Sequence, residues 1–362
     1  MGTRHLRIGD RSIGDGQRAY VIAEIGVNHD GSGDRAVALT RAAAGAGADA
    51  VKLQVFRAEL LMGRASRLAA YQEDAGETDP VSMLRRLELG WDACAAVVEE
   101  AHGLGLHAIA TVFSVELVER AARLGFDAWK TASPDVVHRP LLEALAATGR
   151  SLIVSTGAAT MEEVGRAVGW LDGVKERLAL LQCVSAYPTP PEQAELGGIA
   201  ALRLAHPEVV VGYSDHTQGV ETGALAVAHG AAILEKHFTY DTRAAGPDHA
   251  ASLDADGLRR YVAAARGARV EPRLADDAEA VKRVLEIEAD VRAVSRQSIV
   301  AARALDAGHV LRREDVAFHR PGGGVEPWRV GEIVGRVLGS GCEAGEMLDG
   351  EHLVAEVARE AV

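Results

Sequence analysis

The stretches VGYSDH (residues 211–216) and ILEKHF (233–238) are apolar runs that each end in a histidine and other ionisable groups. Short apolar runs of this kind are typical of buried strands. Ionisable side chains inside a core are costly unless they have a partner or a role there. Because the C-terminal strand ends carry the chemistry in a parallel barrel, the two stretches predict neighbouring strands that open on one functional site.

Eight β-rich runs recur along the chain, separated by Ala-rich stretches with helical spacing, and this alternation predicts a parallel sheet. Eight βα units within about 250 residues predict a (β/α)8 TIM barrel. A doubly wound sheet is the alternative, but it needs a GxGxxG-like turn after the first strand, and GVNHDGSG (26–33) is not one. The expected strands are AYVIAEIG (19–26), AVKLQVF (50–56), LHAIATVF (106–113), FDAWKTAS (126–133), SLIVSTG (151–157), LALLQCVS (178–185), VVVGYSDH (209–216) and AAILEKHF (231–238). Expected helices include residues 34–48, 92–105, 138–149, 160–171 and 220–230.

The chain divides into a barrel at residues 1–268, a linker at 269–294 and a second domain at 295–362. The linker is acidic and Ala-rich, and we interpret it as an exposed helix and connecting segment. From Ser295 the sequence changes to short β-like runs separated by Gly turns, such as QSIVAARALDAGHVLRREDVAFHRPGGG (297–324). A domain of this size is too small for a large core of its own.

Composition limits the possible partners. The 362 residues carry a formal net charge of −13 with a pI near 5.5, which argues against nucleic acid or anionic membrane as a partner. No stretch reaches the roughly 18 uncharged apolar residues of a membrane span, and the N-terminus has no signal-peptide core. Cys94, Cys183 and Cys342 form no CxxC pair, which fits a reducing compartment. We therefore expect a cytoplasmic protein.

Polar residues fall at nearly every expected strand end, and residues two apart on a strand point to the same side. His216 and His237 belong to adjacent expected strands, so their imidazoles can converge on one divalent ion that acts as a Lewis acid. A single buried histidine is more often a hydrogen-bonded core residue, but two at matched strand ends, each beside an acidic residue, favour ligands. The strand-end set is Glu24, Lys52, Gln54, Thr111, Lys130, Ser133, Ser155, Thr156, Ser185, Tyr187, Ser214, His216, Glu235 and His237.

Two lysines of this set, Lys52 and Lys130, predict an anion site, because an unpaired ammonium at the barrel mouth is costly. Hydroxyl donors surround them, and STG (155–157) offers a helix N-terminus that favours phosphate. Any one serine taken alone is better explained as a helix N-cap. Asp248 in RAAGPDHA (243–250) lies near the same opening, although G-P-D is also ordinary turn chemistry. The hydroxyl set is Thr111, Ser133, Ser155, Ser185 and Ser214.

A series of motifs in fixed order resembles the sialic acid synthase family, the phosphoenolpyruvate-condensing synthases of nonulosonic acids. The motifs are AEIGVNHDG, VKLQVF, WKTAS, STGAATMEEV, CVSAYPTPPE, GYSDHT, EKHFTYDTRAAGPDH and HRPGGG, and they cover nearly the whole chain. The resemblance implies a (β/α)8 barrel followed by a small antifreeze-like (SAF) domain. It also implies a domain-swapped homodimer, in which the small domain reaches over the partner's barrel mouth.

The implied reaction joins phosphoenolpyruvate to the aldehyde of an open-chain N-acyl hexosamine, with water addition and loss of phosphate by C–O cleavage. By resemblance, His216 and His237 bind a divalent metal, with Mn²⁺ favoured over Mg²⁺ or Co²⁺, and Glu24 orients water or the reacting aldehyde. The implied phosphoenolpyruvate contacts are Lys52, Thr111, Lys130, Ser133, Ser155, Ser185 and Ser214. The implied sugar contacts are Gln54, Asp135, Tyr187, Asp248 and, from the small domain, Arg320.

The acceptor sugar is left open by departures from the family pattern. Some members have Asn in place of Ser185 and Gly-Glu in place of Pro134-Asp135, and GAAT (157–160) replaces a commoner GMAT. In its motif sequences the chain resembles the legionaminate and spore-coat branch more than the N-acetylneuraminate synthases. Two alternatives stay open: a 3-deoxy-aldulosonate synthase that uses a phosphorylated aldose, and a non-catalytic sugar- or ice-binding protein built around the small domain.

Overall fold

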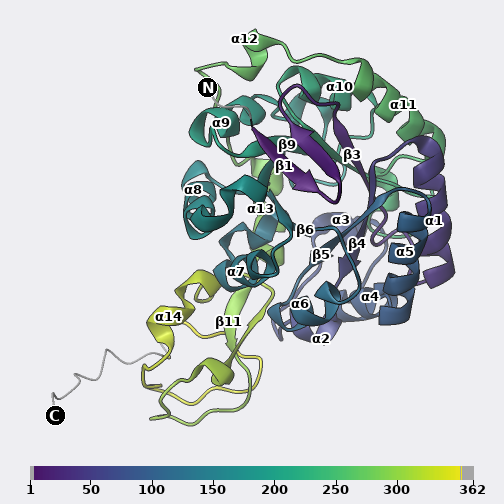
Figure 1. Cartoon of the computed structure of the whole chain (residues 1–362). Coiled ribbons are helices and arrows are strands. Elements are labelled where there is room, and N and C mark those ends of the chain that lie inside the picture. Colours follow the sequence, from purple (N-terminus) through teal and green to yellow (C-terminus); the bar gives the residue numbers. More distant parts are fainter. Residues whose placement is uncertain (1–3, 351, 353–362) are drawn as a thin grey trace.

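The computed structural model describes residues 4–350 and residue 352. In this part of the chain, eight parallel strands close into a barrel in the order β10-β3-β4-β5-β6-β7-β8-β9 (Figure 1), which confirms the predicted TIM barrel. Every expected strand is present, with ends that lie up to two residues inside the predicted run. The barrel strands are β3 (Tyr20–Glu24), β4 (Ala50–Val55), β5 (His107–Val112), β6 (Ala128–Thr131), β7 (Ser151–Ser155), β8 (Leu178–Cys183), β9 (Val210–Asp215) and β10 (Ile233–His237).

Helices surround the barrel and bury their apolar faces against the outside of the strands. The main ones are α1 (Gly33–Ala46), α5 (Trp91–Gly103), α6 (Val115–Ala122), α7 (Arg139–Ala147), α8 (Met161–Trp170), α9 (Gly197–Ala205), α10 (Glu221–Ala228) and α11 (Ala255–Gly267). Three short helices that the sequence did not predict follow β4: α2 (Ala58–Leu61), α3 (Ala70–Asp74) and α4 (Pro80–Leu87). Short 3-10 helices η1 (Ser133–Val137), η2 (Asp172–Arg177), η3 (Pro191–Gln193) and η4 (His249–Ala251) lie in the barrel loops.

An N-terminal hairpin that the sequence did not predict packs against the barrel. Strands β1 (His5–Ile8) and β2 (Arg11–Gly14) pair antiparallel and lie in front of the barrel strands in Figure 1. Leu6, Ile8 and Ile13 are buried in one cluster with inward-facing residues near the N-terminal ends of the strands, such as Tyr20 and Ile233. The hairpin therefore covers the N-terminal end of the barrel and leaves the C-terminal end for a site.

The segment that we predicted as an exposed helix and linker, residues 269–294, is exposed over most of its length, but short helical pieces replace a single helix. It contains three short pieces, α12 (Pro272–Ala275), η5 (Glu286–Glu288) and α13 (Ala289–Ser295). Lys282 and Glu288 are buried. The Glu288 carboxylate accepts hydrogen bonds from the backbone N–H groups of Ala158 (2.6 Å) and Ser185 (2.8 Å). These contacts hold the segment on the loops after β7 and β8, which the charged sequence did not reveal.

The C-terminal domain lies at one end of the molecule, beyond α6 and α7 in Figure 1. It is built on the antiparallel strands β11 (Ser298–Ala301) and β12 (Val316–His319), with η6 (Arg313–Asp315), η7 (Pro327–Arg329) and α14 (Val330–Ile333). A small cluster of its own includes Ile299, Phe318 and Leu348, which confirms a small second domain.

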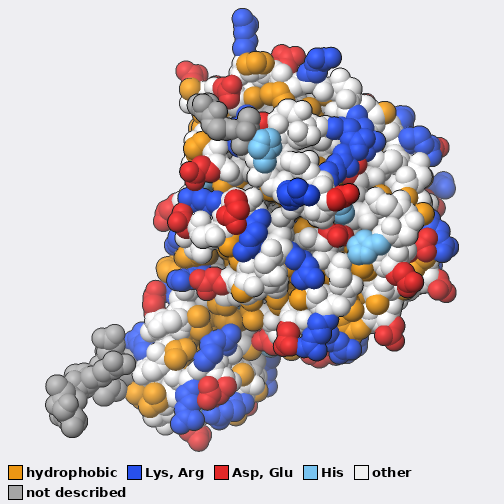
Figure 2. Space-filling view, viewed as in Figure 1, with side chains coloured by type: hydrophobic (Ala, Val, Ile, Leu, Met, Phe, Trp, Pro, Cys, Tyr) orange, Lys and Arg blue, Asp and Glu red, His pale blue; other side chains and the backbone are white. Residues whose placement is uncertain are grey.

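The surface agrees with the composition. Acidic and basic side chains are interspersed over most of the face shown in Figure 2. Among the described residues, no helix is both long and apolar enough to cross a membrane.

Candidate active site

The two stretches VGYSDH and ILEKHF lie side by side in β9 and β10. Their register pairs Ser214 with Glu235 and Asp215 with Lys236. Ser214 and Glu235 point into the barrel, where the Ser214 hydroxyl donates to the Glu235 carboxylate at 2.8 Å. Asp215 and Lys236 form a fully buried ion pair at 3.2 Å beside Tyr261 of the outer helix α11. The ionisable groups of these strands are therefore divided by alternation into an inner, functional set and an outer, structural pair.

One hollow of about 910 Å³, including space open to solvent, lies at the C-terminal end of the barrel. A volume of this order suits a small-molecule site. Of the predicted site residues, Glu24, Ser185 and Asp135 do not line it, although all three are buried close by. The predicted residues that line it are Lys52, Gln54, Thr111, Lys130, Ser133, Ser155, Tyr187, Ser214, His216, His237, Asp248 and Arg320.

We expected the two lysines to lack a partner within the protein, but both lie close to carboxylates. Lys52 forms an ion pair with Glu24 and donates to the Thr111 hydroxyl at 2.9 Å. The Glu235 carboxylate lies 3.7 Å from the Lys52 ammonium and 3.4 Å from that of Lys130. Burial raises the pKa of Glu235, but Lys130 and Lys52 outweigh it and lower this pKa to about 2. Glu235 therefore offsets the repulsion between two cations held in one pocket.

Serine hydroxyls gather around Gly157, at the start of the loop after β7. A Cβ atom at Gly157 would lie 2.4 Å from the Ser185 hydroxyl and 2.8 Å from that of Ser133, so the close approach requires glycine. Among the described residues, the buried hydroxyls of Ser155 and Ser185 have no hydrogen-bond partner. Each of these hydroxyls is therefore free to hydrogen-bond a water molecule or a ligand.

The predicted helix N-terminus at STG (155–157) is wrong. Helix α8 begins at Met161 and has Thr160 as its N-cap, so residues 156–159 form a turn. The polar groups that this stretch offers to an anion are hydroxyls, because the Gly157 N–H donates to Ser133 and the Ala158 N–H to Glu288.

His216 and His237 face each other with ring centroids 5.4 Å apart. His216 Nδ1 donates to the Val184 carbonyl at 2.7 Å, which leaves Nε2 with its lone pair. Burial, with His216 and Lys52 nearby, lowers the pKa of His237 well below its usual value, so this imidazole is neutral. His237 Nδ1 has no hydrogen-bond partner among the described residues and lies 3.5 Å from Asp248 Oδ2. Burial alone would lower the pKa of His216, but Cys183, the hydrogen bond to Val184 and Glu235 raise it. The two imidazoles are the nitrogen donors that this site offers to a divalent cation. Among the described residues, no group of three or more His, Cys, Asp or Glu side chains is arranged to hold a metal.

Two carboxyl groups on the predicted sugar side have raised pKa values. Burial raises the pKa of Asp248 to about 6, against the opposing effect of His216, His249 and Lys52. Burial raises the pKa of Asp135 to about 7, against Arg320 and a 3.2 Å hydrogen bond from Gln297. Near neutral pH these groups can both donate and accept hydrogen bonds. Sugar hydroxyls and amides require partners of both kinds.

Arg320 reaches the hollow of its own chain. Its backbone N–H donates to the Leu61 carbonyl at 2.8 Å, and its carbonyl accepts from the Gly63 N–H at 2.9 Å. The guanidinium lies 5.5 Å from the ring centroid of Phe113. The resemblance implied an arginine delivered across a dimer, whereas here Arg320 lines the hollow of its own chain.

The sequence placed Glu235 at a strand end but assigned it no role, and it gave no sign of the wall formed by the short helices. Glu235 lies two residues before His237 on the same strand face, and this spacing could have assigned it a role. Tyr71 and Gln72 of α3, with Leu61 and Leu87, also line the hollow. They follow no strand end, so the sequence carries no comparable signal for them.

Comparison with known proteins agrees with this geometry. The model of the NeuB family matches residues 39–272, and that of the SAF domain matches residues 296–354. The chain belongs to the NeuB family.

Named members of the NeuB family differ in product at similar distance from this chain. The chain is 34% identical to an N,N'-diacetyllegionaminic acid synthase of Legionella pneumophila, over 98% of this chain and 100% of that protein. It is 31% identical to the N-acetylneuraminate-9-phosphate synthase of mouse, over 83% of each. The crystal structure of the spore coat polysaccharide biosynthesis protein SpsE from Bacillus subtilis superposes with a TM-score of 0.83 at 28% identity, over 98% of this chain and 100% of that one.

If phosphoenolpyruvate binds at the two lysines, as the resemblance implies, its binding should weaken as the pH rises through about 8. Burial, opposed by Glu235, lowers the pKa of Lys52 to about 8, so its ammonium is present below this pH and lost above it. One linked proton weakens the affinity by up to about tenfold per pH unit above that pKa. Calorimetric titration across this range measures the effect. Lys52→Met should bind weakly at every pH without the step, whereas the matched control Lys175→Met, on the outer surface, should behave as wild type. A step that persists in Lys52→Met would contradict the assignment.

Mixing two inactive variants of the chain should not restore activity. If each pocket is completed by Arg320 of its own chain, a His237→Ala chain and an Arg320→Ala chain cannot complement each other. Differently tagged chains are co-expressed, mixed assemblies are purified through both tags, and their turnover is compared with that of each variant alone. Recovery of activity in the mixed assembly would instead show delivery from the partner.

Proposed function

We propose that this chain is a nonulosonic acid synthase that condenses phosphoenolpyruvate with an open-chain N-acyl hexosamine and releases phosphate by C–O cleavage. The observation that carries the proposal is the convergence, in one hollow, of two lysines, the unpartnered hydroxyl of Ser155 and two facing imidazoles. The family match and the synthase names of relatives support this reaction class.

The anionic substrate would lie on the β4 to β8 side of the hollow. Lys52 and Lys130 supply charge-assisted contacts to phosphate and carboxylate, and the hydroxyls of Ser155 and Ser185 supply neutral ones. These groups fix the enol phosphate so that its C3 carbon faces the acceptor aldehyde. Because the positive charges are already fixed in place, they stabilise the departing phosphate without further reorganisation.

The acceptor would lie between the histidines and the small domain. Asp248 and Tyr187 contact its hydroxyls, and Arg320 and Asp135 its acyl group. A new bond forms from C3 of the enol to the aldehyde carbon, and the aldehyde oxygen takes up a proton. Water, oriented by Glu24, adds to C2, and one of its protons balances the proton taken up by the aldehyde oxygen. The other proton leaves with phosphate when the C2–O bond breaks to give the 2-keto acid.

His216 Nε2 and His237 would hold a divalent cation, with Mn²⁺ favoured over Mg²⁺ or Co²⁺. When bound, the ion supplies a Lewis acid that polarises the aldehyde. The chain's own part is to orient both imidazoles and to keep that of His237 neutral. The Val184 carbonyl orients His216, and burial keeps His237 unprotonated.

The acceptor is the finer part of the proposal. Relatives at 31–34% identity are named for legionaminic and neuraminic acid products, so likeness alone selects neither. The resemblance also predicts a homodimer, and the placement of Arg320 within one chain makes exchange of the small domain unnecessary for a complete pocket.

The reaction is tested with phosphoenolpyruvate that carries ¹⁸O in its bridging oxygen. With an N-acyl hexosamine, the label should leave with phosphate if the C–O bond breaks, and mass spectrometry of both products reads this directly. A panel of N-acyl hexosamines, their phosphates and simple aldose phosphates identifies the acceptor. Turnover with aldose phosphates alone would favour a 3-deoxy-aldulosonate synthase. Failure with every acceptor, despite tight sugar binding, would favour a non-catalytic binding protein.

Removal of divalent cations should abolish turnover, and Mn²⁺, Co²⁺ or Mg²⁺ should restore it. His216→Ala and His237→Ala should each lose Mn²⁺ binding, measured by electron paramagnetic resonance, while circular dichroism stays as in wild type, because the residues lie at the barrel mouth. His229→Ala, on the outer face after α10, is the matched control and should bind Mn²⁺ normally. Full activity of metal-free protein would contradict the Lewis-acid role.

A further inference from the structure

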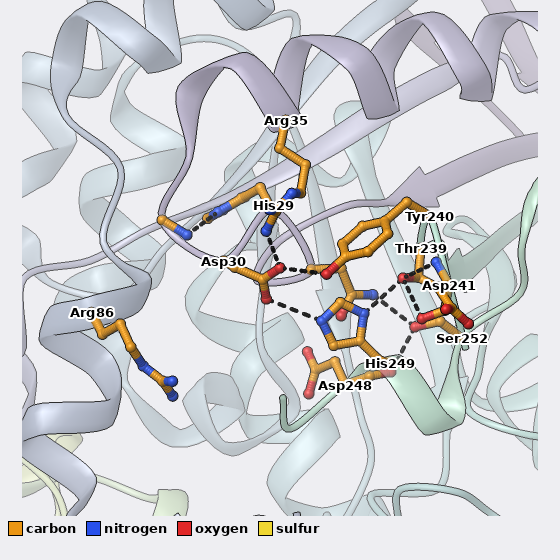
Figure 3. Close-up of polar contacts among 12 residues, drawn as sticks. His29, Asp30, Arg35, Arg86, Thr239, Tyr240, Asp241, Asp248, His249 and Ser252 are labelled. Carbon is orange, nitrogen blue, oxygen red and sulfur yellow. Dashed lines mark hydrogen bonds and ion pairs between the residues drawn. The ribbon is translucent and has the colours of Figure 1, made fainter. Parts of the chain in front are cut away.

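A polar cluster beside the hollow joins the first barrel loop to the last one. It consists of Asp30 and Arg35 from the loop after β3 and the start of α1, and of Tyr240 and His249 from the segment after β10. Figure 3 shows Asp30 between the other three side chains. We propose that this cluster, the Asp30 clamp, positions Asp248 and so sets the affinity for the acceptor sugar. The inference rests on the function proposed above.

The Asp30 carboxylate is the centre of the clamp. Its Oδ1 accepts from His249 Nε2 at 3.0 Å, and its Oδ2 accepts from the Tyr240 hydroxyl at 2.9 Å and from Arg35. The backbone of Asp30 has φ +49°, in the left-handed region that few residues other than Gly, Asn and Asp adopt. A short polar side chain is therefore held in a tight turn and aimed at the opposite loop.

The segment between β10 and α11 contains little regular structure and depends on this contact. Within this segment the structure describes one short 3-10 helix, η4, and Asp248 is its N-cap residue. His249 is buried and contacts both loops, because its Nδ1 hydrogen-bonds the Thr239 hydroxyl at 2.7 Å. Gly246 packs so closely on the ring that a Cβ there would lie 2.8 Å from His249 Cδ2. A shift of His249 would therefore move its neighbour Asp248.

A second set of hydrogen bonds also ties Asp248 to the first barrel loop. Asn28 donates to the Phe238 carbonyl at 3.0 Å and to the Ser252 hydroxyl at 2.8 Å. Ser252 in turn donates to the backbone carbonyl of Asp248 at 2.6 Å. Both sides of Asp248 are thus tied to residues 28–30, which belong to a different loop.

The clamp differs from the groups assigned to phosphoenolpyruvate and metal. Asp30, Tyr240 and His249 do not line the hollow, whereas Asp248 does. No hydrogen bond or ion pair within the described residues joins Asp30 to Lys52, Lys130 or His216. Loosening the clamp should therefore disturb the acceptor side of the pocket and spare the anion side.

Asp30→Asn and His249→Phe test the proposal. Asn tolerates the left-handed backbone but loses the charge that holds Arg35, and Phe keeps the ring volume while removing both hydrogen bonds. Misplacement of Asp248 should raise KM for the acceptor about tenfold or more, with KM for phosphoenolpyruvate nearly unchanged. Asp34→Asn, an exposed carboxylate on the same helix start, is the matched control and should leave both constants unchanged.

Other outcomes overturn the proposal. A merely structural role would lower the melting temperature and the active fraction, and hence kcat, while both KM values stay as in wild type. Equal increases in both KM values would show that the clamp does not act on the acceptor side alone.

If the proposed function is wrong, the wild-type protein will show no turnover with any acceptor, and this result is distinct from the KM changes above. In that case, hydrogen–deuterium exchange over residues 239–252 still tests the clamp. Exchange should be faster in Asp30→Asn than in Asp34→Asn. Equal exchange in these two variants would disprove the clamp.

Discussion

The parallel pairing of β10 with both β9 and β3 is the constraint on which the site depends. It closes the barrel and fixes Glu235 beside Ser214 and His237 beside Glu24. Because alternate residues point inward, the same register turns Asp215 and Lys236 outward, where they neutralise each other. A slip of one residue would exchange the inner and outer sets, so register and chemistry are specified together.

The inner layer is held together by opposite charges. Glu24 pairs with Lys52, and Glu235 lies close to both Lys52 and Lys130. Buried charges are tolerated when they are paired and hydrogen-bonded, and removal of one partner leaves an uncompensated charge. The barrel thus carries a preformed set of cations whose mutual repulsion is offset by its own carboxylates, which suits a site for a multiply charged anion.

Contacts between loops complete the site that the strands form. The segment after α11 places Glu288 on the backbone of the loops that carry Ser185 and Gly157, and the Asp30 clamp ties the first loop to the last. The small domain adds Arg320 from beyond the barrel wall. Strands thus hold Lys52, Lys130 and His237, while loops and the small domain hold Asp248 and Arg320.

The sequence by itself determined the barrel. Eight apolar runs of strand length alternate with stretches of helical spacing, and this pattern shows which segments are buried strands and which are helices. It also determined which strand-end residues meet, since Lys52, Lys130, His216 and His237 follow from alternation on parallel strands. Only the tertiary structure showed that Glu235 lies between the lysines, that Glu288 is buried against two loops, that STG opens a turn, and that Asp30 meets His249 across 219 positions of sequence. The physical reason is that strand periodicity is a local property of the chain. Contacts between loops depend on how distant segments pack, and no local pattern encodes that.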